Sequence, residues 1–252
     1  TKNKMMKEAL VFTDELVPLA YVEALLELAG ELGLSRNTLF AASGVRPQAL
    51  ENPSGRLSFS DFNLLAGVAL QRCQEPALGL LLGQRLNVST HGILGYAVLA
   101  SANLGQAIQF ALRYYRVLGL AFDLDIVEQP GRLQLRAVES MPLGPLSQFA
   151  GETLFASLHS IAQFLLGSPL QGLALGFAFA APNHVQRYLE VFAVQVQFDQ
   201  PYHWLSLPQS YLEQPMTLAN PGTVQMCEQQ CEAILASLDV QDGLLTRVRR
   251  LL

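Results

Sequence analysis

The residues that could do chemistry in this sequence are few and scattered. Cys227 and Cys231 are four positions apart, so one helix face could present both thiolates to a metal ion. The sequence offers no third or fourth ligand at zinc-site spacing, and both cysteines fall in an apolar helical stripe. We therefore interpret them as core residues and predict no metal site.

A second candidate is the pair Glu152 and His159, seven residues apart, which could share a helix face as an acid–base couple in a cleft. Asp123 and Asp125 are close enough to share a proton, but they lie on the exposed side of a predicted hairpin. The sequence contains neither a G-x-S-x-G elbow nor a glycine-rich phosphate loop. We predict no catalytic residue and no cofactor, and we favour a solvated or effector-binding role for the Glu152 face.

Aromatic and histidine side chains offer a binding chemistry instead. Small-molecule sites are apolar concavities with a few polar groups. Six residues near the predicted junction of central helices and sheet suit such a site: His91, Tyr96, Tyr114, Tyr115, His159 and Trp204. The alternative for each is a core or interface aromatic. We predict that they form an effector-binding site.

The composition limits the class of protein. Half of the 252 residues are hydrophobic, so the chain can bury a substantial core as one large domain or two closely packed subdomains. The longest apolar runs fall far short of the ~20 residues of a membrane span, and acidic residues interrupt any secretory segment. Three cysteines form no disulfide framework. We expect a cytoplasmic protein without membrane contact.

The charge is unevenly distributed along the chain. All three lysines lie in residues 1–7, and three of the thirteen arginines lie at 247–250. Residues 8–246 therefore hold ten arginines against twenty-one acidic residues. Such a body should repel duplex DNA.

Helices are expected to position the candidate residues in the first third of the chain, where residues 14–86 have helical apolar spacing throughout. Ser35 is expected to cap a short helix that ends at Gly44, and Ser58 or Ser60 to open the next one.

One part of this region invites a DNA-binding interpretation. Residues 32–47 have the spacing of a helix-turn-helix, and Arg36, Arg46 and Arg56 could contact phosphates. These arginines are dispersed among glutamates, which makes a weak phosphate-binding surface. We favour a structural role for the region.

The central stretch, residues 75–119, has the clearest helix signals. Asn103 and Gln106 have the spacing of a capping box that opens a long helix. The polar residues of that helix form one narrow stripe, at Gln106, Gln109, Arg113 and Arg116. A helix with so narrow a polar face is predicted to be covered on two sides.

A hairpin follows the central helices. Residues 122–126 and 133–137 alternate between apolar and polar side chains, and the Pro-Gly pair at 130–131 suits a type II turn. This turn would place Asp125 opposite Arg136 as a favourable cross-strand pair.

The remaining periodicity predicts three more strands and two long helices. The strands are expected at 172–180, 194–198 and 202–207, and the helices start at Pro145 and at Asn220-Pro221.

The sequence therefore predicts an α+β fold, with a helical N-terminal subdomain followed by a mostly antiparallel sheet of four or five strands covered by long helices. The expected divisions are residues 1–86 for the helical subdomain, 87–239 for an α+β regulatory domain and 240–252 for a connector.

Several short motifs match a known family in order and spacing. They are E-P-A-L-G-L-L-L-G (75–83), G-I-L-G-Y-A (92–97), S-A-N-L-G-Q-A (101–107), R-Y-Y (113–115), Y-L-E-V-F-A-V-Q-V-Q-F (188–198), W-L-S-L-P (204–208), Q-P-M-T-L-A-N-P (214–221) and V-R-R-L-L (248–252). Together they resemble the N-terminal regulatory domain of AraC-type transcriptional regulators, in the arabinose-binding-like branch.

This resemblance implies the effector-sensing and dimerising region of a DNA-binding transcriptional regulator. The end of the chain resembles the start of the AraC-type helix-turn-helix module, so Arg247, Arg249 and Arg250 are expected near DNA. Promoter DNA would be bound by a C-terminal domain that is largely missing here. A small-molecule effector and a homodimer are the expected partners, and residues 239–243 are expected to form a breakable joint. The alternative is a ligand-independent dimerisation module.

Overall fold

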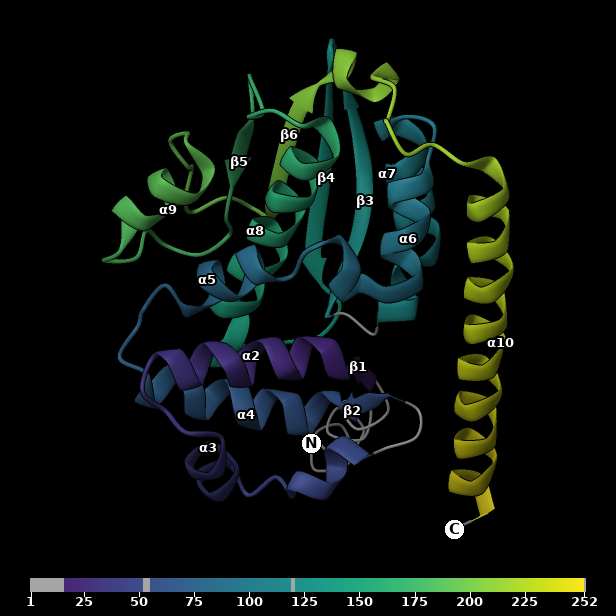
Figure 1. The fold of residues 1–252 in the computed structure, drawn as a ribbon. Coiled ribbons are helices and arrows are strands. Elements are labelled where there is room, and N and C mark those ends of the chain that lie inside the picture. Colours follow the sequence, from purple (N-terminus) through teal and green to yellow (C-terminus); the bar gives the residue numbers. More distant parts are fainter. Residues whose placement is uncertain (1–15, 52–54, 119–120, 252) are drawn as a thin grey trace.

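The computed structural model of the chain describes residues 16–51, 55–118 and 121–251, with side chains up to Ser237 (Figure 1). It has the predicted α+β architecture, in which helices surround a four-stranded antiparallel sheet. The strand order is β3 (Phe122–Gln129), β4 (Arg132–Glu139), β6 (His203–Pro208) and β5 (Ala174–Gly176). Among these residues, no helix is both long and apolar enough to cross a membrane.

The hairpin of β3 and β4 forms in the predicted register. Gly131 has a φ of 71°, which the third position of a type II turn requires. Asp125 lies opposite Arg136, whose Nε donates a hydrogen bond to Asp125 Oδ1 at 2.8 Å. The turn and this ion pair fix the register of the two strands.

The sheet is smaller on the β5 side than predicted. Residues 172–180 form a strand only at Ala174–Gly176, and residues 194–198 form no strand. The second segment reaches the sheet through an isolated bridge between Gly176 and Gln197. Rings from both segments pack on one another, namely Phe177, Phe179 and Phe198. The expectation of two full strands is wrong because the apolar alternation reflects this aromatic packing.

The N-terminal region is helical, as expected, with a small sheet that the sequence does not predict. Its helices are α2 (Leu19–Glu31), α3 (Arg36–Ser43) and α4 (Phe59–Arg72). Strand β1 (Leu16–Pro18) pairs with β2 (Arg56–Ser58). Because β1 leads into α2 and β2 into α4, the pairing holds the starts of the two helices side by side.

Side-chain caps begin two of these helices at predicted positions. Ser35 Oγ accepts a hydrogen bond from Thr38 N at 3.2 Å, and Ser58 Oγ accepts one from Asp61 N at 3.0 Å. Gly44 ends α3 with a φ of 74°. Each cap satisfies a backbone group that the helix end would otherwise leave exposed.

Two arginines of the helix-turn-helix-like region contact the protein itself. Arg36 donates to both carboxylate oxygens of Glu23 at 2.7 and 2.9 Å. Arg56 donates to the carbonyl oxygen of Val117. These contacts support the structural role that the sequence favours.

Helices α5 (Leu78–Arg85) and α8 (Ser147–Leu166) pack closely against each other. A Cβ atom added at Gly79 would lie 2.6 Å from Phe149 O, and one at Gly83 would lie 2.5 Å from Thr153 O. The two glycines are four residues apart on one face of α5. They allow a backbone separation that no larger residue permits.

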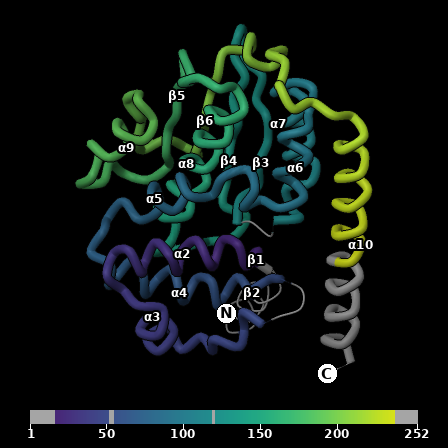
Figure 2. The backbone as a smooth tube through the Cα atoms, in the orientation of Figure 1, coloured from purple at the N-terminus to yellow at the C-terminus, as the bar shows by residue number. Residues whose placement is uncertain are grey.

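Helices α6 (Gly92–Ala100) and α7 (Leu104–Tyr114) lie between the sheet and α10 (Pro221–Leu251) (Figure 2). The capping box of α7 forms as predicted: Asn103 Oδ1 accepts from Gln106 N at 2.8 Å. The Gln106 side chain reaches back to Ala102 N at 2.6 Å. Helix α7 is therefore anchored at its start and covered on two sides.

Helix α10 begins at the predicted position, where Asn220 Oδ1 accepts from Thr223 N at 3.0 Å. Its backbone is helical through residues 239–243, where a breakable joint was expected, and the joint stays a prediction. The side chains of Arg247, Arg249 and Arg250 lie outside the described residues.

Shorter elements connect these parts. They are η1 (Pro47–Glu51), η2 (Val88–His91), η3 (Tyr115–Leu118), η4 (Gly144–Leu146), α9 (Val185–Phe192) and η5 (Gln209–Glu213).

Candidate ligand-binding site

A cavity of about 230 Å³ is lined by residues of the sheet, α7, α8 and the N-terminal helices. The sheet contributes Leu124, Leu133, Leu135, Leu205 and Leu207. Helix α8 contributes a long apolar face that includes Phe149, Leu154, Leu158, Ile161 and Leu165. Helix α7 contributes Leu104, Ile108, Ala111 and Leu112, and η3 contributes Tyr115. The walls are therefore mainly aliphatic.

Five residues of the N-terminal region line part of this cavity. They are Val17 on β1, Tyr21 on α2 and Phe59, Phe62 and Asn63 on α4. The pairing of β1 with β2 sets both helices in place. Tyr21 and Asn63 bring polar groups to this part of the lining.

Three polar residues of the lining form a chain of hydrogen bonds. Ser157 Oγ donates to the carbonyl oxygen of Leu86 at 2.8 Å, so it accepts from His91 Nε2, 3.1 Å away. His91 Nδ1 is then left as the acceptor for the Tyr21 hydroxyl. This arrangement describes a neutral imidazole with its proton on Nε2.

Burial favours the neutral form of both rings. It lowers the pKa of His91 to about 4, against a weaker opposing effect of the Leu86 backbone. It also raises the pKa of Tyr21 well above its usual range. The His91 ring and the Tyr21 hydroxyl are therefore uncharged at neutral pH, although the nearby Arg56 guanidinium opposes part of the rise in the pKa of Tyr21.

Local sequence explains how His91 reaches the cavity. Asn87 Oδ1 accepts from Ser89 N at 3.0 Å and from Thr90 N at 3.3 Å, which caps the short helix η2. Helix α6 begins directly after His91 and folds back on η2, where a Cβ at Gly95 would lie 1.8 Å from a backbone oxygen. Glycine at position 95 is thus required for this turn.

The structure brings two of the six predicted site residues to the cavity, namely His91 and Tyr115. Tyr96 is 54% exposed on α6. His159 is buried against Phe192, with ring centroids 5.3 Å apart. Trp204 lies against Gly176 and donates to Gln200 Oε1 at 3.3 Å.

Tyr114, the remaining member of the set, faces α10. Its hydroxyl donates to Glu228 and Glu232, at 3.2 and 3.1 Å. Burial and these two carboxylates raise the pKa of Tyr114 to about 12, so the hydroxyl keeps its proton and remains a donor. Adjacent tyrosines thus serve opposite sides of α7.

Sequence analysis missed Tyr21, Asn63 and Ser157 as members of the lining. For Ser157 a signal exists, since a hydroxyl lies within the inward apolar stripe of α8 and must find a partner there. Tyr21 and Asn63 reach the cavity only through the β1–β2 pairing, which the sequence does not predict.

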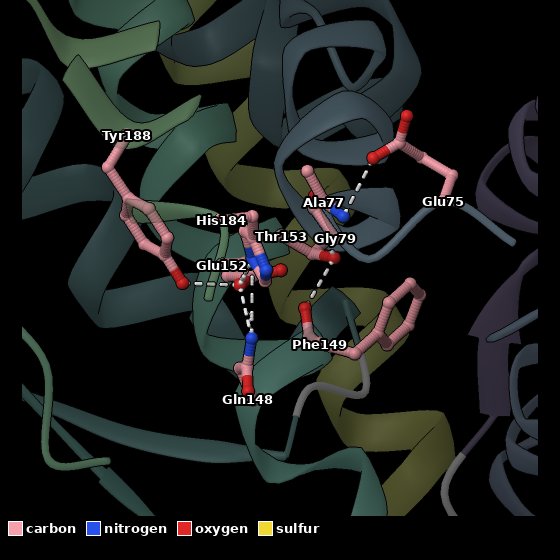
Figure 3. Close-up of polar contacts among 9 residues, drawn as sticks. All are labelled: Glu75, Ala77, Gly79, Gln148, Phe149, Glu152, Thr153, His184 and Tyr188. Atoms are coloured by element: carbon pink, nitrogen blue, oxygen red, sulfur yellow. Dashed lines mark hydrogen bonds and ion pairs between the residues drawn. The ribbon is translucent and has the colours of Figure 1, made fainter. Parts of the chain in front are cut away.

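A separate buried cluster surrounds Glu152, on the part of α8 that faces α5 and α9 (Figure 3). Glu152 Oε1 accepts from Gln148 Nε2 at 2.8 Å and from the Tyr188 hydroxyl, and it lies 3.0 Å from His184 Nε2. The alternative acid–base couple with His159 does not form, because Glu152 turns toward the loop before α9. The favoured solvated or effector-binding role is wrong, since Glu152 is 1% exposed and does not line the cavity. The carboxylate links α8 to α9 as a structural element.

The contact of α10 with α6 and α7 contains the two cysteines. Cys227 and Cys231 are fully buried and pack with Phe110 and Tyr114. Burial raises the pKa of both thiols, to about 11 for Cys231. This placement confirms that they are core residues. Within the described part of the chain, no three His, Cys, Asp or Glu residues are placed to hold a metal ion.

Comparison with known proteins adds information of three kinds. Residues 33–216 match the family described as the arabinose-binding domain of AraC transcription regulators, N-terminal. The chain is 67% identical over 247 residues to an ornithine utilization regulator of Pseudomonas aeruginosa, covering 98% of this chain and 73% of that protein. It is 22% identical over 238 residues to an uncharacterized HTH-type transcriptional regulator of Mycobacterium tuberculosis, covering 92% of this chain and 69% of that protein.

Among solved structures, the transcriptional regulator CdpR from Pseudomonas aeruginosa has a similar fold, with a TM-score of 0.57 and 20% sequence identity. The match covers 76% of this chain and 59% of that one, so the chain spans less than two thirds of its length.

Proposed function

Because this chain belongs to the family of AraC transcription regulators with an N-terminal arabinose-binding domain, we propose that it is the effector-sensing region of such a regulator. The observation that carries the proposal is the cavity, whose wall α7 also packs on α10. An effector in the cavity would act on α10 through α7. In this proposal the regulator controls genes of ornithine utilization, as the name of its relative suggests.

The coupling path is short. Leu94 and Leu118 line the cavity and also belong to the buried cluster that contains Cys227 and Cys231 of α10. An effector that fits one arrangement of α6, η3 and α10 better than another shifts the balance between them. The hydrogen bonds from Tyr114 hold one such arrangement.

Promoter DNA is the proposed target of the whole regulator, bound through a C-terminal helix-turn-helix module beyond these residues. Residues 8–246 carry about twice as many acidic residues as arginines, which disfavours DNA contact by the sensing body. Arg36 and Arg56 already contact Glu23 and Val117 within the body.

Dimerisation through α6 and α10 is the proposed second role. The two helices pack on each other, and each exposes a large apolar side chain: Tyr96 is 54% exposed and Met226 is 50% exposed. This face supports the alternative function, a dimerisation module that works without ligand.

The experiment compares two tryptophan substitutions on α7 in the full-length regulator. Ala111→Trp fills the cavity, whereas Gln109→Trp adds the same side chain on the exposed face of the helix. Transcription from the controlled promoter is measured in cells grown with and without ornithine, so that the effector can be ornithine or a compound formed from it. We expect Ala111→Trp to abolish the response and Gln109→Trp to preserve it. A full response in folded Ala111→Trp protein would refute sensing through the cavity, whereas a parent regulator without any response would favour the ligand-independent module.

A further inference from the structure

We infer that the cavity takes an uncharged, extended aliphatic ligand with a neutral oxygen-bearing head group, and that a free amino acid is not its occupant. The inference rests on the proposed function, because it names the chemical class of the effector in the same cavity. Three features of the described residues carry it: the charge of the lining, the small number of its polar groups, and the size of the cavity.

The charge of the lining excludes ionic ligands. Among the described residues that form it, none is Asp, Glu, Lys or Arg. An ion transferred from water into such surroundings loses several kcal/mol of solvation that no opposite charge restores. A diamino acid such as ornithine carries two ammonium groups and a carboxylate at neutral pH. No side chain of the described lining is an ion partner for any of them, and the Arg56 guanidinium near Tyr21 is not part of that lining.

His91 cannot easily supply the missing positive charge. Its Nδ1 is occupied by the Tyr21 hydroxyl and its Nε2–H by Ser157, whose own proton is directed to Leu86 O. Protonation of His91 would leave two N–H donors and force the Tyr21 hydroxyl to turn away. The chain of hydrogen bonds therefore maintains a neutral imidazole beside the ligand.

The lining has few polar groups. Tyr21, His91 and Ser157 direct theirs mainly at one another, and Asn63 of α4 adds an amide among aliphatic residues such as Leu133, Leu165 and Leu207. The Asn63 amide can donate to a carbonyl or accept from a hydroxyl, and the Tyr21 oxygen can also accept. A neutral alcohol or carbonyl group suits these polar groups, and an alkyl chain suits the rest of the lining.

The dimensions favour an extended chain. The lining residues of α8 run from Phe149 to Leu165, which corresponds to about 24 Å along the helix axis. At roughly 30 Å³ for each water-sized group, a cavity of 230 Å³ holds about eight non-hydrogen atoms. Apolar cavities of about 150 Å³ with similar linings already bind benzene. A medium-length alkyl chain therefore fits.

The test is isothermal titration calorimetry of the 252-residue chain with three probes: 1-octanol, octanoate and L-ornithine. We expect 1-octanol to bind, octanoate to bind at least tenfold more weakly, and ornithine to give no heat of binding. Octanoate as strong as octanol, or ornithine stronger than either, would overturn the inference. So would the absence of octanol binding.

Variants of α7 locate the binding. Ala111→Trp should abolish the octanol signal, and the matched surface variant Gln109→Trp should keep it. If Ala111→Trp does not fold, Leu112→Phe replaces it in the test. This variant adds less volume to the cavity and should weaken octanol binding. Equal octanol affinity in all folded variants would place the probe elsewhere and refute the assignment.

The outcomes separate this inference from the proposed function. Loss of the transcriptional response in Ala111→Trp without octanol binding to the parent chain would leave cavity sensing intact and refute the ligand class. Octanol binding that Ala111→Trp abolishes, with a normal transcriptional response, would leave the ligand class intact and refute cavity sensing.

Discussion

Replacing Gly83 by alanine should destabilise the protein, because the methyl group has no room between α5 and α8. The added Cβ would lie 2.5 Å from Thr153 O, 2.6 Å from Ala156 Cβ and 3.0 Å from Ser157 N. Two of these three atoms belong to the backbone of α8 and cannot rotate away. The helices must therefore separate by several tenths of an ångström.

The magnitude follows from two opposing effects. Overpacking of a tight contact typically costs about 1–3 kcal/mol, and a site blocked by backbone belongs at the upper end. Alanine in place of glycine within a helix returns at most about 1 kcal/mol. We expect Gly83→Ala to lower the free energy of unfolding by about 2 kcal/mol. For a chain of this length, that corresponds to a fall in Tm of roughly 4–8 °C.

Urea denaturation followed by circular dichroism measures the effect, and Gly67→Ala is the matched control. Gly67 lies in the interior of α4, and a Cβ there has no described atom within 4 Å. This variant should gain about 0.5–1 kcal/mol from helix propensity alone. If Gly83→Ala were stabilised as much as Gly67→Ala, the close packing of α5 on α8 would be refuted.

Three other predictions concern the polar groups. Tyr114→Phe removes the hydroxyl that reaches Glu232, and it should lower the free energy of unfolding by about 1 kcal/mol; unchanged urea denaturation would show that this bond adds nothing. Glu152→Ala leaves the buried Tyr188 hydroxyl without its acceptor, so it should lower the free energy of unfolding by about 3 kcal/mol. A decrease smaller than that caused by Tyr114→Phe would contradict the structural role of Glu152. The pKa of His91 is about 4 in the folded protein and near 6.5 in the unfolded chain. The contribution of the neutral imidazole to the free energy of unfolding is therefore complete above pH 6.5 and is lost as the pH falls toward 4. That loss amounts to about 3 kcal/mol at about 1.36 kcal/mol per pKa unit. Urea denaturation at pH 7, 6 and 5 should show a flatter pH dependence for His91→Gln, and equal slopes would argue against a buried neutral imidazole.

Local signals predicted much of the fold. The caps at Ser35, Ser58 and Asn103 depend on residues within three positions, so the sequence alone places them. The hairpin is equally local, since Pro130 and Gly131 determine its turn. The segments around β5 were not predictable in the same way, because Phe177 and Phe198 pack as rings that only the folded chain brings together.

The candidate site was less predictable, because its residues converge from distant parts of the chain. His91 and Tyr115 were predicted from residue type alone. Sequence cannot decide which of the adjacent residues Tyr114 and Tyr115 faces the cavity, since either suits an apolar helix. Likewise, Glu152 contacts His184 across 32 residues, and no periodicity within α8 indicates that partner.

Because Tyr114 and Tyr115 point in different directions, their contacts depend on the number of residues in α7 more than on the identity of those residues. One inserted residue between the Asn103 cap and these tyrosines would rotate both by about 100°, turning each from its own partner toward another neighbour. A substitution, by contrast, does not change the directions in which Tyr114 and Tyr115 point. Ile108 and Ala111 lie on the ligand side, whereas Phe110 lies on the α10 side, so a substitution at Ile108 or Ala111 can change the shape of the cavity without altering the contact with α10.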